Sequence, residues 1–526
     1  MPRVRETVFA AAVGSLTLPL AAFPQGVEVS GTLRDAPHII PLEGEAGTYF
    51  SGSFQGAGAV LTLGGTDAPT LRQLAKGTGG AERVHFVTTA PGSQLQISGP
   101  KGAQYDLQLT VPERLADQAA PRDALMSPRL REAMVALAEG EDATQVWADL
   151  AADGTPLVEE GTSDSQWLTF LYFGAQHNVR LLGGPSSDHD WLSRLGDSAI
   201  WYRSYQVPSD TRLSYRLAPD VPQIAGDWRE KRIAILASAA ADPENRSPWP
   251  ATAPDAWQQW STVSLPDAPQ QPGYEQAQGR HPDLETEVFA STKLGNSRRL
   301  DLYRSPQFDP RDPEAILLLM FDCPRAVEEW EIPQMLDALT TSGRLPSVAA
   351  VFIDPIDFAH RSEELPGNAR FSAFLAEEVL PHALAYFGLK HHRARTVLAG
   401  ASYGGIGATH AALDRPESFG AVISLSGSYW WSPSGGQGPR DGLTYMSERL
   451  IREGVPQGLR SYIAAGAFEV DPTGAHDIRE TSRQVHATLR ALGAQSHWRL
   501  YSGGHDGFVW RGAFADGLLH LFARQE

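Results

Sequence analysis

Cysteine is almost absent from this sequence, since Cys323 is the single example in 526 residues. No disulfide can therefore form within the chain, and no group of cysteines and histidines has the spacing of a zinc site. A lone cysteine is more often a small buried apolar side chain than a nucleophile. Glycine-rich phosphate-binding motifs are also missing from the junctions between strands and helices. We therefore expect no metal and no other cofactor.

Positive charge is scarce as well, because 44 lysines and arginines against 62 aspartates and glutamates give a net charge of −18. This balance argues against nucleic acid or an anionic membrane as a general partner, although a local basic pocket can still bind a small molecule. No run of ~20 apolar residues lies deep in the chain. The expected partner is a small-molecule substrate, and no membrane span is expected in the mature protein.

The first 25 residues are typical of a secretory signal peptide. Arg3 and Arg5 precede an apolar stretch at residues 8–20, which is followed by two alanines. Residues 1–25 are therefore a predicted signal peptide, and the predicted location is the periplasm or the cell exterior. An acidic residue in the charged region, Glu6, and the lack of an Ala-x-Ala cleavage site favour the alternative, a cytoplasmic protein.

Two all-β regions are predicted in the N-terminal half. Residues 26–112 contain short alternating runs separated by glycine-rich turns, the pattern of a small β-sandwich. Residues 113–164 show helical periodicity and form a predicted helical connector. Residues 165–238 return to short strands and predict a second sandwich of immunoglobulin-like size. Residues 239–283, rich in proline, glutamine, serine and tryptophan, predict a linker or a strap packed on another surface.

The C-terminal region, residues 284–526, alternates between apolar strands such as Ala315–Phe321 and helical segments such as Arg370–Phe387 and His476–Leu492. Near-continuous apolar strands separated by helices indicate a mostly parallel sheet covered on both faces. The predicted fold class is therefore α/β, with a C-terminal α/β-hydrolase domain preceded by two small all-β sandwich domains.

The segment Gly400-Ala-Ser402-Tyr-Gly404 lies between an apolar strand and a helical run, the context that a nucleophile elbow requires. Small residues two positions before and after the serine avoid clashes in the tight turn. The serine oxygen then projects above the sheet at a helix N-terminus, whose dipole favours a developing oxyanion. Ser402 is the predicted nucleophile. Its oxyanion donors are expected to be the N–H groups of Tyr403 and of Cys323 or a neighbour, after the strand that ends at Phe321.

A base and an acid are expected further along the chain. His505 lies in a Gly-Gly-His-Asp segment after the last predicted strand, where the α/β-hydrolase order of nucleophile, acid and histidine places its base. The acid, which orients the imidazole, should follow the preceding strand. Glu469 is the first candidate there, with Asp471 as the alternative and Asp477 as a more distant third. Asp506 is expected to be a local hydrogen-bond partner.

The sequence around these residues resembles the enterochelin esterases, which are α/β-hydrolases of the esterase D-like group that hydrolyse trilactone siderophores. The resemblance runs from about residue 142 to the C-terminus. The matching segments are Gly154–Glu159, Leu265–Pro272, Asn296–Arg299, Ile353–Asp357, Arg361–Asn368, Gly400–Gly405, Arg415–Gly420, Ser424–Trp431, Gly503–Asp506 and Trp510–Gly512. The pair Trp430-Trp431 and the segment Leu265–Pro272 are more specific than the elbow.

Two departures from that family stand out. The family's Asp-Gly after the oxyanion strand is Asp322-Cys323 here, so the position of the second oxyanion donor is in question. The sandwich at residues 26–112 and the predicted signal peptide are additions to the usual cytoplasmic form. That sandwich is similar to the pre-peptidase C-terminal type found on secreted enzymes.

The resemblance implies a serine esterase that hydrolyses the ester bonds of a ferric or iron-free catecholate siderophore such as enterobactin and so frees iron. Arg361 and Arg370 would then neutralise the anionic complex, and Trp430 and Trp431 would stack on its catechol rings. A structural ion pair for Arg361 and core packing for the tryptophans are equally compatible with the sequence.

The residues alone establish only an acyl-ester hydrolase. The alternative function is a secreted carboxylic-ester hydrolase or acyl transferase that acts on a feruloyl or polysaccharide ester, with the two sandwiches as carbohydrate-binding modules. A binding protein on a decayed hydrolase scaffold is disfavoured, because candidates for nucleophile, acid and base all occur in the required order.

Overall fold

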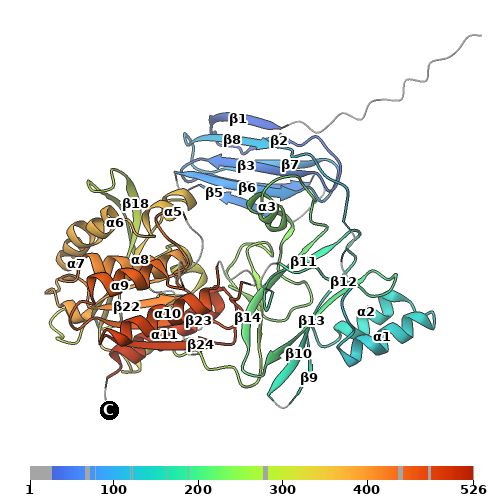
Figure 1. The fold of residues 1–526 in the computed structure, drawn as a ribbon. Coiled ribbons are helices and arrows are strands. Elements are labelled where there is room, and N and C mark those ends of the chain that lie inside the picture. Colours follow the sequence, from blue (N-terminus) through green and yellow to red (C-terminus); the bar gives the residue numbers. More distant parts are fainter. Residues whose placement is uncertain are drawn as a thin grey trace, which may run out of the picture.

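The computed structural model describes residues 26–524 except 66–71, 78, 119, 121, 163, 187–188, 276–281, 283, 436–441 and 472–475. Figure 1 shows a sandwich at the N-terminal end, a second sandwich flanked by two helices, and an α/β part that ends at the C-terminus. The predicted signal peptide, residues 1–25, lies outside the described residues. Within the described ranges, no helix is both long enough and apolar enough to cross a membrane.

The N-terminal sandwich consists of two four-stranded antiparallel sheets with the strand orders β1-β8-β3-β6 and β2-β7-β4-β5. Every second side chain of strands such as β7 is buried, because successive residues of a strand point to opposite faces. Phe50, Phe54 and Phe86 fill the core between the sheets. The strands are β1 Val27–Thr32, β2 His38–Pro41, β3 Tyr49–Gln55, β4 Val60–Gly65, β5 Arg72–Lys76, β6 Ala81–Val87, β7 Ser93–Ser98 and β8 Gln104–Thr110.

Two helices follow, α1 Pro128–Ala138 and α2 Ala143–Ala151. The Ser127 hydroxyl accepts a hydrogen bond from the Leu130 N–H group at 3.1 Å, and proline occupies the first helical position. The two helices bury Leu130 and Leu150 against the second sandwich. Both lie within residues 113–164, the predicted helical connector, although residues 157–160 of that range form a strand of the second sandwich.

The second sandwich also has two antiparallel sheets, with the strand orders β12-β13-β10-β9 and β11-β14-β16-β15. Its strands are β9 Leu157–Glu160, β10 Ser165–Phe173, β11 Val179–Gly183, β12 Ser193–Arg194, β13 Ile200–Pro208, β14 Arg212–Pro219, β15 Pro248–Trp249 and β16 Trp260–Ser264. Strands β15 and β16 lie in the segment predicted as a linker. They complete a sheet, because β16 pairs with β14 from Ser261 to Ser264.

Helix α3, Trp228–Ser238, was not predicted at all. Its N-cap, Asp227, and Glu230 form a reciprocal capping box, which is a sequence signal that the β-rich surroundings obscured. The helix packs between the two sandwiches, since Ala234 contacts the core near Tyr49 while Ile235 contacts the core near Leu182.

The C-terminal part is built on an eight-stranded sheet with the order β17-β18-β20-β19-β21-β22-β23-β24. Strands β17 and β18 are antiparallel, and the strands from β20 to β24 run parallel. The strands are β17 Leu284–Ala290, β18 Ser297–Arg304, β19 Ile316–Phe321, β20 Val348–Ile353, β21 Thr396–Ala401, β22 Ala421–Leu425, β23 Arg460–Gly466 and β24 Gln495–Tyr501. This is the α/β-hydrolase sheet that the sequence predicts.

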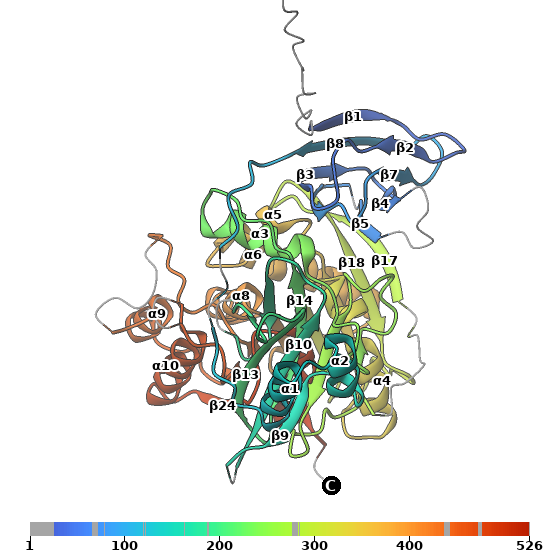
Figure 2. The ribbon, with the colours of Figure 1, turned by 90° about the vertical axis from the view of Figure 1, so that its right-hand side faces the viewer.

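Helices cover both faces of this sheet (Figure 2). Helices α4 and α11 pack on one face, and α6, α7 and α8 pack on the other, where α9 and α10 extend the layer. The bounds are α4 Ile332–Thr341, α5 Phe358–Glu364, α6 Ala369–Phe374, α7 Leu380–Phe387, α8 Tyr403–Asp414, α9 Tyr445–Glu453, α10 Ile478–Ala491 and α11 Gly507–Phe522. Helix α5 follows β20, and helix α8 follows β21, so both begin at the carboxyl edge of the sheet.

The second sandwich docks on the loop between β24 and α11. The Arg212 N–H group donates to the Ser502 carbonyl at 2.9 Å. A Cβ atom at Gly503 would lie 2.6 Å from the Arg212 carbonyl, and one at Gly504 would lie 2.9 Å from the Gly184 carbonyl. Two glycines therefore allow backbone of the second sandwich to approach the loop that carries His505.

Candidate active site

Ser402 occupies the sharp turn between β21 and α8. Its φ of 57° lies in the left-handed region that non-glycine residues rarely adopt, so the backbone is strained there. A Cβ atom at Gly400 would lie 2.7 Å from the Gly404 backbone. The small residues of the motif are thus required by close approach, as the sequence predicts, and the serine stands at the N-terminus of α8.

His505 follows β24 and pairs with Glu469, which follows β23. The imidazole Nδ1 and the Glu469 Oε1 atom are in hydrogen-bond contact. The histidine side chain is 39% exposed and that of the glutamate 2%, so an accessible base is held by a buried carboxylate. The Trp510 ring stands edge-on to the imidazole at a centroid distance of 4.7 Å. With Nδ1 engaged, Nε2 is the ring nitrogen left to accept a proton.

Three hydrogen bonds fix Glu469 and its surroundings. Its Oε2 atom accepts from the Ser426 hydroxyl at 2.7 Å and from the Gly466 N–H group at 2.5 Å. The Ser426 oxygen in turn accepts from the Trp510 indole at 2.8 Å. Both oxygens of the buried carboxylate are therefore satisfied, as buried charges require.

The other candidate acids have different partners. Asp471 accepts from the His476 N–H group at 2.8 Å, and its Oδ2 atom lies 3.2 Å from the His476 ring. Asp477 caps helix α10 by accepting from the Glu480 N–H group. Among the three, the structure pairs Glu469 with His505.

Ser402 lies on the same carboxyl edge of the sheet as this pair. Its N–H group donates to the carbonyl of Leu425, the residue next to Ser426. Its Oγ lies 3.2 Å from the Ser428 Oγ atom. In the part of the chain that the structure describes, no hydrogen bond joins the Ser402 hydroxyl to the His505 ring. Hydrogen bonds between catalytic groups are often long in the absence of substrate and tighten only in its complex.

The two predicted oxyanion donors differ in whether their N–H groups are already hydrogen-bonded within the protein. The Tyr403 N–H group lies in the first turn of α8, where N–H groups have no partner within the helix, so it can donate to an oxyanion. The Cys323 N–H group instead donates to the Ile353 carbonyl at 3.3 Å. Cys323 is therefore not the second donor that the sequence predicts, because its backbone still follows the register of β20. The next residue, Pro324, has no N–H group.

The Cys323 side chain has a packing role. Burial raises the pKa of the thiol, and the neighbouring Asp301 carboxylate raises it further. The thiol donates to Asp301 Oδ2 at 3.1 Å. A protonated, buried thiol of this kind is not a nucleophile.

Asp506, beside the histidine, is a local hydrogen-bond partner as expected. It caps α11 by accepting from the Val509 N–H group at 3.0 Å, and it accepts from the Ser214 N–H group of β14 at 3.4 Å. Burial raises the pKa of this carboxyl group to about 7. The residue thus links the histidine loop to the second sandwich.

The two arginines predicted to bind substrate are engaged within the protein. Arg361 pairs with the carboxylate of Asp322 through Nε and Nη2, and its Nη2 atom donates to the Ala401 carbonyl at 3.2 Å. It therefore supports the elbow through an ion pair. Arg370 donates to the Lys293 carbonyl at 3.0 and 2.6 Å. These local acceptors, which the sequence does not reveal, take the hydrogen bonds expected for substrate.

The two tryptophans after β22 have different surroundings. Trp431 packs closely, because a Cβ atom at Gly367 would lie 2.8 Å from its ring and it stands edge-on to His410. Trp430 is half-buried beside the nucleophile, with its ring centroid 5.9 Å from that of Tyr403 and 4.6 Å from that of His476. Trp430 thus lies beside the residue that follows the nucleophile, whereas Trp431 packs against Gly367 and His410.

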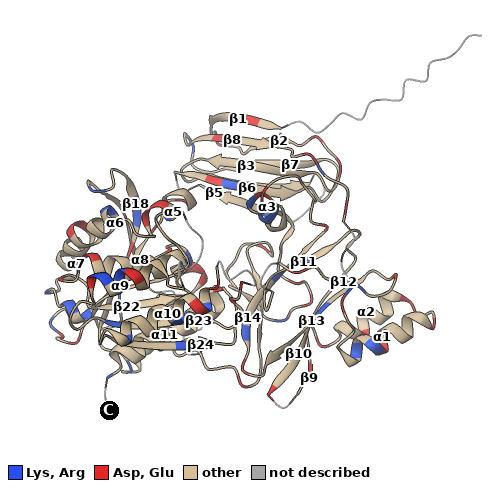
Figure 3. Ribbon diagram, in the orientation of Figure 1, with Lys and Arg blue, Asp and Glu red and all other residues tan. Residues whose placement is uncertain are grey.

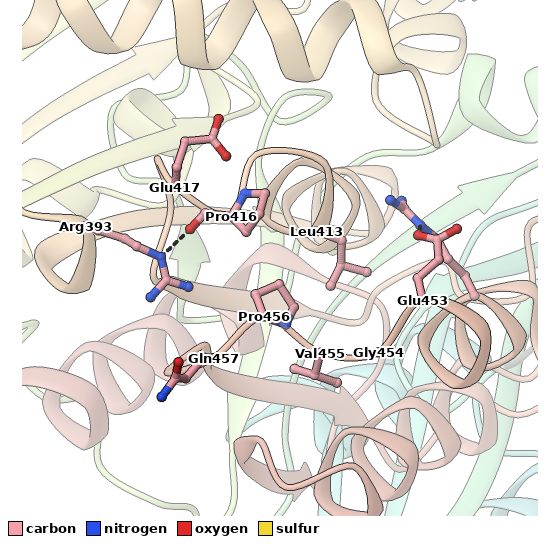
Figure 4. A pocket seen from close by; sticks show the side chains of 10 residues that line it. Arg393, Leu413, Pro416, Glu417, Glu453, Gly454, Val455, Pro456 and Gln457 are labelled. Atoms are coloured by element: carbon pink, nitrogen blue, oxygen red, sulfur yellow. Dashed lines mark hydrogen bonds and ion pairs between the residues drawn. The ribbon is translucent and has the colours of Figure 1, made fainter.

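A cavity lies at the C-terminal end of α8, the end opposite to Ser402 (Figure 4). It has a volume of about 590 Å³ and is lined by residues that include Leu413, Pro416 and Val455. Three of its charged residues are engaged, since Arg393 donates to the Pro416 carbonyl and Arg449 pairs with Glu453. The described residues contain no group of three or more metal-binding side chains. The catalytic constellation at the carboxyl edge of the sheet is therefore the better candidate site.

Comparison with known proteins supports this choice. A family model described as putative esterase matches residues 291–521, and one described as enterochelin esterase, N-terminal, matches residues 168–274. The iron(III) enterobactin esterase of Dickeya dadantii is 31% identical over 414 residues, which cover 73% of this chain and 93% of that protein.

This chain belongs to the enterochelin esterase family. The iron(III) enterobactin esterase of Escherichia coli is 32% identical over 344 residues, covering 63% of this chain and 81% of that relative. The enterobactin esterase of Shigella flexneri, crystallised in the presence of enterobactin, is 29% identical with a TM-score of 0.58 and covers 71% of this chain and 97% of its own. The protein is thus a carboxylic ester hydrolase.

Several residues at the site of this esterase were not assigned from the sequence. Ser426, Ser428 and His476 surround the catalytic candidates, and the first two lie in a segment whose resemblance to the family was evident. Arg298 forms a buried ion pair with Glu364 at 2.8 Å, and Asn296 donates to the same carboxylate. These contacts join the start of β18 to the end of α5.

We predict that Glu469→Gln lowers ester hydrolysis by more than tenfold and that Asp471→Asn lowers it by less than threefold. The reason is that the Glu469 carboxylate contacts the His505 ring, while the Asp471 carboxylate contacts His476. Steady-state kcat/KM on a p-nitrophenyl ester measures both effects. A larger loss in Asp471→Asn would assign the acid to Asp471, and two small losses would indicate a Ser–His dyad.

Proposed function

We propose that this esterase hydrolyses the ester bonds of a catecholate trilactone siderophore such as enterobactin in its ferric form, and so releases iron. The observation that carries the proposal is the 31% identity to an iron(III) enterobactin esterase along 93% of that relative, including the region before the catalytic domain. A solved relative crystallised in the presence of enterobactin supports the same class of substrate.

In the proposed mechanism, the Ser402 oxygen attacks the ester carbonyl carbon while its proton passes to His505 Nε2. The buried Glu469 carboxylate orients the imidazole and stabilises its positive charge. The Tyr403 N–H group donates to the oxyanion of the tetrahedral intermediate. Collapse breaks the ester bond, and the proton on Nε2 passes to the departing alkoxide oxygen. Water activated by His505 then attacks the acyl-enzyme, which yields the free carboxylate and regenerates Ser402.

We expect Ser402→Ala and His505→Ala each to lower the hydrolysis of ferric enterobactin by about a thousandfold or more, because nucleophile and base act as one unit. Chromatography of the linear products measures the reaction, and circular dichroism controls for folding. Near-normal turnover in either folded variant would contradict the mechanism. A wild-type enzyme that cleaves feruloyl or simple aryl esters but neither ferric nor iron-free enterobactin would contradict the substrate.

We propose further that the protein is exported and acts in the periplasm or outside the cell. The basic and apolar pattern of residues 1–25 supports this, as does the additional N-terminal sandwich. A single cysteine is compatible with export, because no disulfide has to form.

Export predicts that the mature protein begins near Phe23 and is recovered from the periplasm or the medium. N-terminal sequencing of the protein from fractionated cells checks this. An intact Met1 or Pro2 on protein from the cytosol would contradict it.

A further inference from the structure

The N-terminal turn of α3 carries an exposed aromatic residue beside cationic ones. Trp228 is 70% exposed, which is unusual for so large an apolar side chain. Figure 3 shows the lysine and arginine residues of this helix, which include Arg229 and Lys231. The C-terminal half of α3 is buried between the two sandwiches through Ala234, Ile235 and Ala237. A firmly anchored helix therefore presents these side chains to solvent.

Arg229 faces the catalytic domain. Its guanidinium group lies 5.3 Å from the centroid of the Phe358 ring, and Phe358 is the first residue of α5. Figure 2 shows α3 beside α5, although they belong to different parts of the chain. Phe358 is itself 55% exposed. An exposed ring, Phe358, and a cation, Arg229, thus lie together where α3 meets the hydrolase, and the exposed Trp228 directly precedes Arg229 on the helix.

Among the residues that the structure describes, the contact found for the Arg229 guanidinium is with the Phe358 ring and not with a carboxylate. Its neighbours on α3 do have polar contacts, since Glu230 completes the capping box and Arg232 donates to His189 Nε2 at 3.2 Å. The positive charge of Arg229 is therefore available to a ligand, unlike that of Arg361, which is paired with Asp322.

This junction is connected to the nucleophile through Tyr403, the residue after Ser402. Arg361 of α5 lies 5.8 Å from the Tyr403 ring. Burial raises the pKa of Tyr403, and the positive charges of Arg361 and Arg229 oppose that rise. The Tyr403 ring also lies 5.9 Å from the Trp430 ring. Arg361 of α5 and Trp430 of the loop after β22 are thus both neighbours of the residue next to the nucleophile.

We propose that Trp228 and Arg229 form a substrate-recognition arm, through which the second sandwich binds the anionic aromatic rings of the substrate while Ser402 cleaves its ester. The inference rests on the proposed function. A planar cation beside aromatic faces is suited to a flat ring that carries negative charge. Iron binding removes protons from catechol oxygens, so the ferric complex carries more negative charge than the free siderophore and depends more on Arg229.

The test measures binding without hydrolysis, in the Ser402→Ala background, by quenching of tryptophan fluorescence with ferric and iron-free enterobactin. Arg229→Ala is expected to raise the Kd of the ferric complex by about tenfold and that of the iron-free ligand by less than threefold. The Kd of the ferric complex should also depend less on salt in this variant, because one exposed charge is lost. Trp228→Ala is expected to raise both Kd values by about fivefold.

Lys231→Ala is the matched control, because residues two positions apart on a helix point about 200° apart. It removes the same charge from the same turn and should leave both Kd values within twofold. Equal effects of Arg229→Ala and Lys231→Ala, or no effect of either, would overturn the recognition arm. Ferric enterobactin that binds tightly to Ser402→Ala but is not hydrolysed by the wild type would instead refute the proposed function and leave the arm supported.

Discussion

The contact between strand β14 and the loop from Ser502 to Asp506 is the constraint on which the rest of the site depends. Backbone of the second sandwich lies against two glycines of that loop, and the Arg212 N–H group closes a hydrogen bond across the junction. His505 comes directly after the glycines. Because a loop is mobile unless its backbone is held, the second sandwich contributes to the position of the catalytic base.

Buried carboxyl groups connect the histidine loop and the elbow to the residues around them. Glu469 connects His505 to Ser426, and Asp506 connects the histidine loop to β14 and to the start of α11. Asp322 is paired with Arg361 below the elbow. Each of these carboxyl groups has hydrogen-bond or ion-pair partners that compensate its burial, so it restricts the geometry of the site instead of merely destabilising the fold.

The sequence predicts much of this arrangement because the relevant signals are local. An apolar strand before Gly400–Gly404 and a Gly-Gly-His-Asp segment after the last strand suffice to place Ser402 and His505 at one edge of a parallel sheet. The choice of Glu469 over Asp471 also agrees with the contacts, since only the former reaches the imidazole. The alternation of β-rich segments similarly predicts both sandwiches.

What the sequence does not predict depends on partners that are distant along the chain. Arg361 is an ion-pair partner because the turn after β19 brings Asp322 to it, 39 residues away. Cys323 is not an oxyanion donor because its N–H group reaches Ile353 on the neighbouring strand. The sequence of β16 is typical of a linker, and the segment is a strand because it pairs with β14. The sequence of α3 lies in a β-rich region, and the helix is stabilised because the two sandwiches bury one of its faces.

The central claim is that the second sandwich positions the catalytic loop, and the labelling rate of Ser402 by a fluorophosphonate in Gly504→Ala tests it most directly. A methyl group there would lie 2.9 Å from the Gly184 carbonyl of the sandwich, whereas one at Gly80 would meet only ordinary contacts of 3.7 Å or more. We expect Gly504→Ala to be labelled about tenfold more slowly than the wild type while remaining folded, because a 1 Å shift of a catalytic group can have effects of this size or larger. Gly80→Ala should be labelled at the wild-type rate. A folded Gly504→Ala that is labelled at the wild-type rate would contradict a positioning role for the second sandwich.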